Sequence, residues 1–469
     1  MRRRILGRMA ATAATLSVVA VLPALTGGSP ALAHDGHRSG GSGHSAPTPA
    51  GPAYKSVGYF TQWGVYGRNY QVKNVQTSGT AAKLTHLNYA FANIGADGKC
   101  FEANVAGEGD AWADYQRPLD AAGSVDGTAD TAEQPLAGNF NQLRELKAKN
   151  PKLKVLISIG GWGWSTNFSD AALTPASRKA LVASCLDIFI KGNLPLLDGK
   201  GGPGSAAGLF DGVDIDWEWP GSSGDVDTVY RPQDKKDFTA LAAEFRKQLD
   251  AYGRTTHKHY DLTAFLPAAP AKIDAGFEVR KIFTYLDFGT VQGYDFHGPY
   301  ETTTNQQSAL KAPRNTPVPD DFSDTQAVGD WISRGAPSRQ LVLGVPFYGQ
   351  GWTGVPDGGT AGLFQPSTGP APATWQAGNE DYHALKALAG SGAYTVHRDT
   401  KDGFAWLYDG TDFWTYDDPQ VIAQKTAYIR QQHLGGAMAW SLDGDTADGE
   451  LIGAIHAGLN PPPPHHRHR

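Results

Sequence analysis

The residues best suited to chemistry lie in one short segment, Asp211 to Pro220, which reads DGVDIDWEWP. If this segment is a β-strand, its side chains alternate between two faces, so Asp214, Asp216 and Glu218 point to the same side. Three carboxyl groups this close repel one another, and their pKa values must move apart. One of them is then kept protonated near neutral pH, as a general acid for cleavage of a glycosidic bond requires.

Alternating acids also occur on solvated surfaces and in calcium-binding loops. The residues between the acids of a calcium loop belong to a flexible stretch rich in Gly and Asn. Here they are Val213, Ile215 and Trp217, which suit the outer face of a buried barrel strand. We therefore favour the catalytic interpretation, and we expect Asp211, at the start of the segment, to have a structural role.

Eight short apolar runs bounded by turn residues are predicted to be strands. They are Ser56–Gln62, His86–Ala92, Lys154–Ile159, Gly212–Trp217, Tyr260–Leu266, Phe288–Tyr294, Gln340–Phe347 and Gly435–Leu442. Helical spacing separates most of them, at Asn141–Lys149, Ser177–Ile190, Arg231–Tyr252, Thr325–Arg334 and Pro419–Gln432. This α/β alternation predicts a (β/α)8 TIM barrel, whose active site lies at the C-terminal ends of its strands.

The segment between the seventh and eighth predicted strands, about 353–418, is much longer than an ordinary connection. Its strand-like pieces are Tyr394–His397, Phe404–Tyr408 and Asp412–Tyr416, and Asn379–Ala389 has helical spacing. We expect a small α+β insertion that forms a wall beside the mouth of the barrel.

The two ends of the sequence differ from this body. Residues 1–33 combine four arginines, an apolar run and an Ala-Leu-Ala site, which is typical of a signal peptide. Sec and twin-arginine export both remain open, and a membrane anchor is the weaker alternative. Residues 34–52 are predicted to be a flexible Gly/Ser/Pro/His leader and 461–469 a Pro/His-rich tail, which leaves 53–460 for the catalytic barrel. We expect a secreted protein without membrane association after export.

Composition narrows the classes of partner. The chain has 469 residues, of which 40% are hydrophobic, enough for a large core. Without residues 1–33 it holds 37 Lys and Arg against 47 Asp and Glu, a net charge of −10. Such an acidic chain is a poor nucleic-acid binder.

Cys100 and Cys185 are the two cysteines of the chain. In an oxidising compartment they form one disulfide, or they remain separate buried apolar residues; both readings are open. Neither has a Cys or His partner at ligand spacing, so we expect no metal site there, and no cofactor.

The acidic segment matches DGxDxDxE, the signature of glycoside hydrolase family 18 on its fourth barrel strand, and the chain resembles that family over roughly Lys55 to Asn460. Further family motifs follow in order along the sequence: Tyr59–Asn69, Ser158–Trp162, Tyr294–Gly298, Pro346–Trp352 and Ala439–Ser441. The chain looks like a secreted bacterial chitinase with an α+β insertion before the eighth strand. It departs from the pattern at Gln350, where the family often has Arg, and at Gln292 and Gly293.

The resemblance implies hydrolysis of the β-1,4 bonds between N-acetylglucosamine units of chitin or chitooligosaccharides, with retention of configuration. In this family the nucleophile is the substrate's own acetamido oxygen rather than an enzyme carboxylate. Glu218 would be the general acid/base, and Asp216 would hold the acetamido N–H. Asp214 would share charge with Asp216, and Tyr294 would hydrogen-bond the acetamido oxygen.

The resemblance also implies a set of substrate-binding residues. Tyr59 and Ser158 would stabilise Asp214, and Asp295 would bind the substrate beside Tyr294. Flat aromatic rings stack on the apolar faces of sugars. The aromatic residues implied are Trp63, Trp162, Tyr348 and Trp440. For Trp375, Trp406 and Trp414 of the insertion, core packing and substrate binding are both open.

Two other functions within the fold compete with this one. An endo-β-N-acetylglucosaminidase acting on N-glycans uses the same chemistry. A non-catalytic chitin-binding lectin has the same barrel, but such relatives typically lose the acid that is intact here as Glu218. A metal-dependent deacetylase would need a His-rich set of metal ligands, and the body of this chain shows no such pattern. We expect a monomer.

Overall fold

The computed structural model describes residues 54–319 and 321–462. The predicted signal peptide (1–33), the predicted leader (34–52) and all but the first two residues of the predicted tail (461–469) lie outside these residues. Among the helices of the described chain, none combines the length and the apolar character that crossing a membrane requires.

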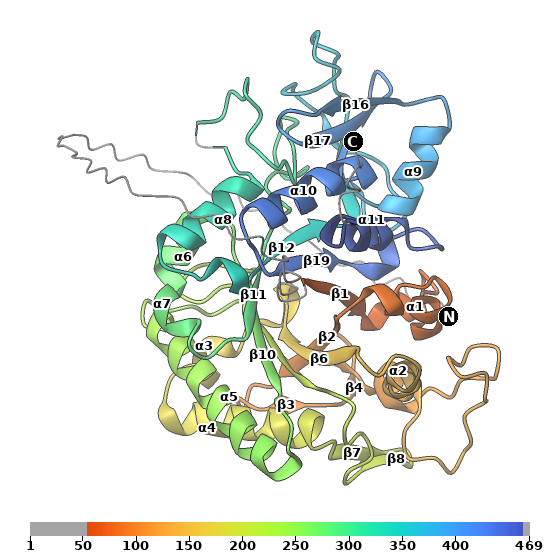
Figure 1. Cartoon of the computed structure of the whole chain (residues 1–469), viewed down its shortest axis with the longest axis vertical. Helices are drawn as coiled ribbons and strands as arrows, with labels where there is room; N and C mark the ends of the chain where they lie inside the picture. Colours follow the sequence, from red (N-terminus) through yellow and green to blue (C-terminus); the bar gives the residue numbers. More distant parts are fainter. Residues whose placement is uncertain (1–53, 320, 463–469) are drawn as a thin grey trace, which may run out of the picture. The chain divides into compact units, whose positions relative to one another are not determined.

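Eight parallel strands form a closed barrel (Figure 1). They are β1 (Lys55–Thr61), β2 (His86–Ile94), β6 (Lys154–Gly160), β9 (Gly212–Asp216), β10 (Asp261–Leu266), β11 (Phe288–Val291), β12 (Leu341–Pro346) and β19 (Gly436–Trp440). Their order is β1-β19-β12-β11-β10-β9-β6-β2, and pairing of β1 with β2 closes the ring. This confirms the predicted (β/α)8 barrel, and each predicted strand overlaps one of these eight.

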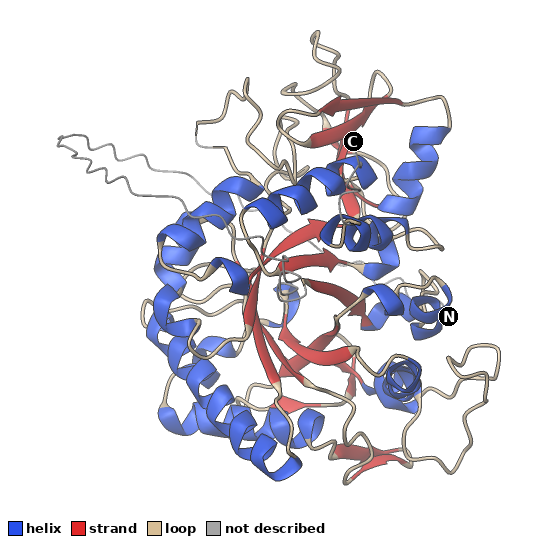
Figure 2. Cartoon of the chain, in the orientation of Figure 1, coloured by secondary structure: helices blue, strands red, loops and turns tan. Residues whose placement is uncertain are grey.

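Helices surround the barrel strands (Figure 2). They are α1 (Val72–Thr77), α2 (Gly138–Lys149), α3 (Phe168–Ala172), α4 (Pro175–Cys185), α5 (Asp234–Thr256), α6 (Pro270–Gly276), α7 (Val279–Ile282), α8 (Asp324–Ser333), α10 (Pro419–Gln431) and α11 (Glu450–Leu459). Helix α4 begins where local chemistry favours it, because the Thr174 side chain accepts from the Ser177 N–H and Pro175 fits the first turn. Helices α1, α3, α6, α7 and α11 were not predicted; all of these except α11 hold too few turns to show periodicity.

The alternation of side chains on β9 separates two layers. Val213, Ile215 and Trp217 face outward into the hydrophobic layer between barrel and helices. The Trp217 ring stacks on Phe168 of α3 at 5.2 Å and lies 6.1 Å from the ring of Phe238 of α5. Apolar burial of this kind contributes about 25 cal/mol per Å². The acids between them must therefore face the barrel interior.

Between β12 and β19 the chain forms the expected α+β insertion, an antiparallel six-stranded sheet with one helix. Its elements are β13 (Tyr348–Thr353), β14 (Gly369–Pro370), β15 (Asn379–Asp381), α9 (Tyr382–Gly390), β16 (Thr395–Asp399), β17 (Phe404–Tyr408) and β18 (Phe413–Tyr416). Residues 379–381, predicted as the start of a helix, instead pair with β13 as β15. In Figure 1 the insertion lies above β12 and β19.

The connection after β2 carries small elements that were not predicted. Strand β3 (Cys100–Phe101) pairs with β2, and β4 (Asn104–Val105) and β5 (Gly109–Asp110) form a hairpin. A second small hairpin, β7 (Leu194–Leu197) with β8 (Lys200–Gly202), follows α4. Of the two alternatives for the cysteines, the structure shows the disulfide, which joins Cys100 of β3 to Cys185 of α4.

Candidate active site

Asp214 is completely buried at the centre of the barrel mouth and accepts three hydroxyl hydrogen bonds. Tyr59 Oη lies 2.6 Å and Ser158 Oγ 2.8 Å from its Oδ2, and Thr263 Oγ1 lies 2.6 Å from its Oδ1. Ser158 and Thr263 are its direct partners in the ladders with β6 and β10, so the three side chains share the inner face. Thr263 was not predicted, because its place beside Asp214 follows from the register of β10 with β9.

Asp216 is also buried, and its Oδ1 has no hydrogen-bond partner within the described chain. Burial, followed by the charges of Glu218 and Asp214, raises its pKa well above the usual range. Burial also raises the pKa of Asp214, although hydrogen bonds from Thr263 and Tyr59 oppose this. Burial therefore disfavours the ionised forms of Asp214 and Asp216, and both carboxyl groups favour retention of a proton.

Glu218 lies just beyond the end of β9 and is partly exposed. Its backbone N–H donates to Ser165 Oγ at 2.8 Å, and the same oxygen lies 3.1 Å from the Asp216 carbonyl oxygen, so a buried serine fixes the backbone on both sides of Trp217. Burial raises the pKa of Glu218 to about 8, against the opposing charge of Lys272. The raised pKa favours the protonated form of Glu218 near neutral pH.

Tyr294 and Asp295 follow the end of β11. The buried Tyr294 ring lies 6.2 Å from Phe265 and 6.1 Å from Tyr348. Asp295 has a left-handed backbone, with φ 56°, and its Oδ1 accepts from Tyr348 Oη at 2.6 Å and from Gln350 Nε2 at 2.8 Å. Both donors belong to β13, so the insertion shapes this side of the site. Gln350 supplies a neutral donor to Asp295.

His297, two residues further on, anchors the same loop. Its Nε2 lies 2.6 Å from Asp321 Oδ1 and its Nδ1 2.9 Å from Glu301 Oε2. Burial lowers its pKa, but the hydrogen bonds to the two carboxylates outweigh this and raise the pKa to about 9. The sequence analysis included His297 in a motif without giving it a role.

Aromatic rings form a cluster at the mouth around Trp440, the last residue of β19. Its ring lies 5.1 Å from Tyr59, 5.7 Å from Phe91 and 6.5 Å from Trp63. Trp63 is 42% exposed, and Trp162, after β6, is 48% exposed. These exposed rings leave flat faces free for a sugar. Phe91 was not predicted.

The three tryptophans of the insertion separate into two kinds. Trp406 and Trp414 are buried within hydrophobic clusters, which is the packing alternative. Trp375 is 46% exposed, and its indole N–H donates to Asp381 Oδ2 at 3.0 Å. The Arg68 guanidinium lies 5.2 Å from the Trp375 ring, so this side chain is fixed in place although exposed.

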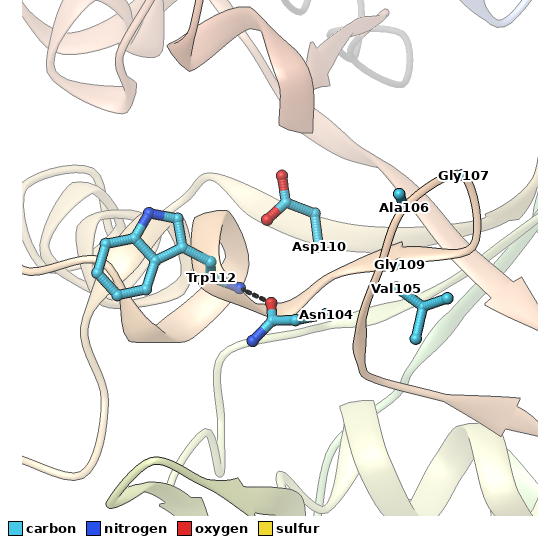
Figure 3. A pocket seen from close by; sticks show the side chains of 7 residues that line it. All are labelled: Asn104, Val105, Ala106, Gly107, Gly109, Asp110 and Trp112. Carbon is cyan, nitrogen blue, oxygen red and sulfur yellow. Dashed lines mark hydrogen bonds between the residues drawn. The ribbon is translucent and has the colours of Figure 1, made fainter. Parts of the chain in front are cut away.

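A shallow pocket of about 370 Å³ lies at the β4–β5 hairpin (Figure 3). It is lined by Asn104, Val105, Ala106, Gly107, Gly109, Asp110 and Trp112. Tyr66 Oη donates to Asp110 at 2.6 Å, and the Trp164 indole N–H donates to the Gly107 carbonyl at 2.8 Å. Loops after β1 and β6 therefore hold this hairpin near the mouth, apart from the acidic row.

One group of side chains in the described chain has the spacing of metal ligands. Ligand atoms of His259, Asp261 and Asp287 lie within 4.8 Å of one another, at the start of β10 and just before β11. Asp261 already binds Lys154 Nζ at 2.7 Å, and Asp287 lies 3.3 Å from Arg246. Because these cations compensate the carboxylates, we assign no metal to the group.

Comparison with known proteins agrees with this geometry. Residues 55–445 match Glycosyl hydrolases family 18. Chitinase 63 of Streptomyces plicatus is 40% identical over 427 residues, which cover 90% of this chain and 63% of that protein. Chitinase A1 of Niallia circulans is 36% identical over 454 residues, covering 89% and 61%. The chain thus spans 60% to 63% of the length of these relatives and of chitinase C of Streptomyces lividans.

Among solved structures, the catalytic domain of the psychrophilic chitinase B from Arthrobacter TAD20 is 50% identical to this chain. The two superpose with a TM-score of 0.83, covering 87% of this chain and 95% of that one. The family match extends over most of the chain and includes every strand of the barrel. The chain therefore belongs to glycosyl hydrolases family 18.

Proposed function

We propose that this chain is a chitinase, which hydrolyses the β-1,4 bonds between N-acetylglucosamine units of chitin and chitooligosaccharides. The observation that carries the proposal is the row Asp214, Asp216 and Glu218, which ends at the barrel mouth in a partly exposed carboxyl whose pKa burial raises to about 8. The aromatic cluster around Trp440 supports a sugar polymer as substrate, as do the names of the relatives.

The mechanism that fits this row is retaining and substrate-assisted. Glu218 gives its proton to the glycosidic oxygen while the acetamido carbonyl oxygen of the same sugar attacks C1, and the bond to the leaving sugar breaks. Asp216 accepts a hydrogen bond from the acetamido N–H through its unpaired Oδ1. Tyr294 donates to the acetamido oxygen. Water, deprotonated by Glu218, then opens the cyclic intermediate, and two inversions give net retention.

Asp214 supports this step through its charge. Its three hydroxyl donors let it carry part of the negative charge of the interior acids without a nearby cation. Trp63, Trp162 and Trp440 bind sugar rings by stacking, and Tyr348 and Asp295 form the wall beside them. We further propose that the protein is exported through residues 1–33 and acts outside the cell as a monomer.

The test is hydrolysis of a chitin hexamer by the wild type and by Glu218→Gln, with product size and anomer followed in the first minutes. We expect wild-type products in the β-anomer, and a loss of about two to four decades of rate in the variant. Asp211→Asn is the matched control, because it removes a carboxyl just before the same strand, at its other end, where Asp211 pairs with Lys147 at 2.6 Å. It should keep near-wild-type activity.

The other outcomes would contradict the mechanism or indicate a different function. Products in the α-anomer would exclude the retaining mechanism. A wild type that binds the hexamer without cleaving it would be a lectin. Release of N-glycans from a glycoprotein, with no cleavage of the hexamer, would make the chain an endo-β-N-acetylglucosaminidase.

A further inference from the structure

Lys272 lies in the first turn of α6 (Pro270–Gly276), the helix that follows β10. Its Nζ is 5.0 Å from the centroid of the Trp219 ring, and Trp219 is the residue that follows Glu218. The buried Trp219 ring stacks on Phe265 at 5.5 Å, and Phe265 stacks on Tyr294. The ammonium group is thus held at one end of a row of aromatic rings, Trp219, Phe265 and Tyr294, that begins next to Glu218 in the chain.

The charge of this lysine acts on Glu218. The two groups interact through their charges and not through a hydrogen bond, so that Lys272 opposes the rise in the pKa of Glu218. Burial lowers the pKa of Lys272 to about 8, and the charge of Glu218 counters this. The ammonium therefore favours its charged form near neutral pH, although Lys272 is partly buried.

The other ionisable groups that face Glu218 are acidic. They are Asp216 on β9 and Asp295 after β11; burial and the charges of these acids raise the pKa of Tyr294, so its phenol stays neutral. When Glu218 gives up its proton, a hydrogen bond with Asp216 favours the new negative charge, whereas the charge of Asp295 disfavours it. Among the described residues, Lys272 is the cation whose charge lowers the pKa of Glu218.

We propose that Lys272 stabilises the Glu218 carboxylate that forms when its proton passes to the glycosidic oxygen, and that it is a positioning residue for the acid step. The inference rests on the proposed function, because it needs Glu218 to be the acid. The proton moves from Glu218 to the leaving oxygen as the C1–O bond breaks. Lys272 keeps its own proton throughout, and it exchanges none with the substrate.

If Lys272 lowers the pKa of Glu218, removing Lys272 changes the kinetics in a way that loss of structure does not. Without it, Glu218 becomes a weaker acid, so hydrolysis slows where Glu218 is protonated, while the protonated form persists to higher pH. A sugar with a good leaving group needs little protonation and should be hardly affected. A direct contact of Lys272 with the sugar would instead change KM.

The experiment compares wild type, Lys272→Met and Lys272→Arg on the chitin hexamer from pH 4 to 10, and on a 4-nitrophenyl chitobioside. Lys281→Met is the matched control, because it removes an equal charge from an exposed ion pair with Glu278. For Lys272→Met we expect kcat/KM on the hexamer to fall about tenfold at pH 6 and the alkaline limb to move up by about one pH unit. The aryl glycoside should lose less than about threefold, and Lys272→Arg should resemble the wild type.

Three results would overturn the inference. Lys272→Met could show the wild-type profile on both substrates, it could raise KM alone, or it could lose activity equally on both substrates with the limb unmoved. Thermal unfolding of each variant identifies a folding defect. Failure of the proposed function looks different, since the wild type would then not cleave the hexamer at any pH.

Discussion

Carboxyl groups at the two ends of the barrel have opposite kinds of partner, and the residues in and just before β9 show the contrast. Just before the strand, Asp211 binds Lys147 Nζ at 2.6 Å and the backbone N–H of Val155 at 3.0 Å. Further along, Asp214 is surrounded by neutral hydroxyl groups, and Asp216 keeps an oxygen without a partner.

The neighbouring strand β10 repeats the first arrangement. Asp261 at its start lies 2.7 Å from Lys154 Nζ and 3.0 Å from His86 Nε2. Burial raises its pKa, but the hydrogen bonds from His86 and Lys154 outweigh this and lower the pKa to about 2. At the N-terminal end the carboxyl groups of Asp211 and Asp261 form ion pairs with lysines, whereas burial raises the pKa values of Asp214, Asp216 and Glu218 at the C-terminal end, which favours their protonated forms.

The largest difference between the two ends should appear in catalysis. Asp216→Asn replaces the ionisable carboxyl proposed to accept from the acetamido N–H by a neutral amide, which is a weaker acceptor and cannot share a proton with Glu218, so we expect kcat/KM on the chitin hexamer to fall about 100- to 1000-fold. Asp261→Asn makes the same chemical change at the other end and should leave kcat/KM within about threefold at 25 °C. Equal losses in the two variants would show that the ends do not differ in role.

The fold could be predicted because its signals are local and repeated. Eight apolar runs separated by turn residues determine a barrel whatever their exact ends, and the strand bounds were off by only a few residues. The helical start predicted for the insertion at 379–381 was wrong. There the tertiary pairing of Asn379 with Gln350 overrides local spacing and makes a strand.

The site was less predictable because part of it depends on neighbours in space. The period of β9 alone indicates that Asp214, Asp216 and Glu218 share a face. Thr263 and Lys272 come from the next barrel unit, and no short pattern marks a threonine as a hydrogen-bond donor or a lysine as a neighbour of Glu218. Thr263 emerges only when the register of β9 with β10 is known, and Lys272 only when the contact of α6 with Trp219 is known.

The second prediction concerns stability at the N-terminal end. The pKa of Asp261 is lowered in the folded protein, so its contribution is fully present above its ordinary pKa near 4 and is lost as pH falls toward 2. We expect Asp261→Asn to lower the free energy of unfolding by about 2 kcal/mol at pH 7. Denaturant unfolding at pH 7 and pH 3 measures this difference, which should shrink at the lower pH; a difference that stays constant would contradict the ion-pair explanation.

The smallest effect should have the opposite sign, at the C-terminal end. The pKa of Glu218 is raised in the folded protein, so between its ordinary value near 4 and about 8 the folded state keeps a proton that the unfolded state has lost. Stability therefore falls as pH rises through this window. Glu218→Gln removes that titration, so the inactive variant should be more stable than the wild type, by on the order of 1 kcal/mol at pH 8 and by less at pH 5. Thermal unfolding at both pH values tests this, and a variant less stable than the wild type at pH 8 would show that Glu218 is as well compensated as Asp261.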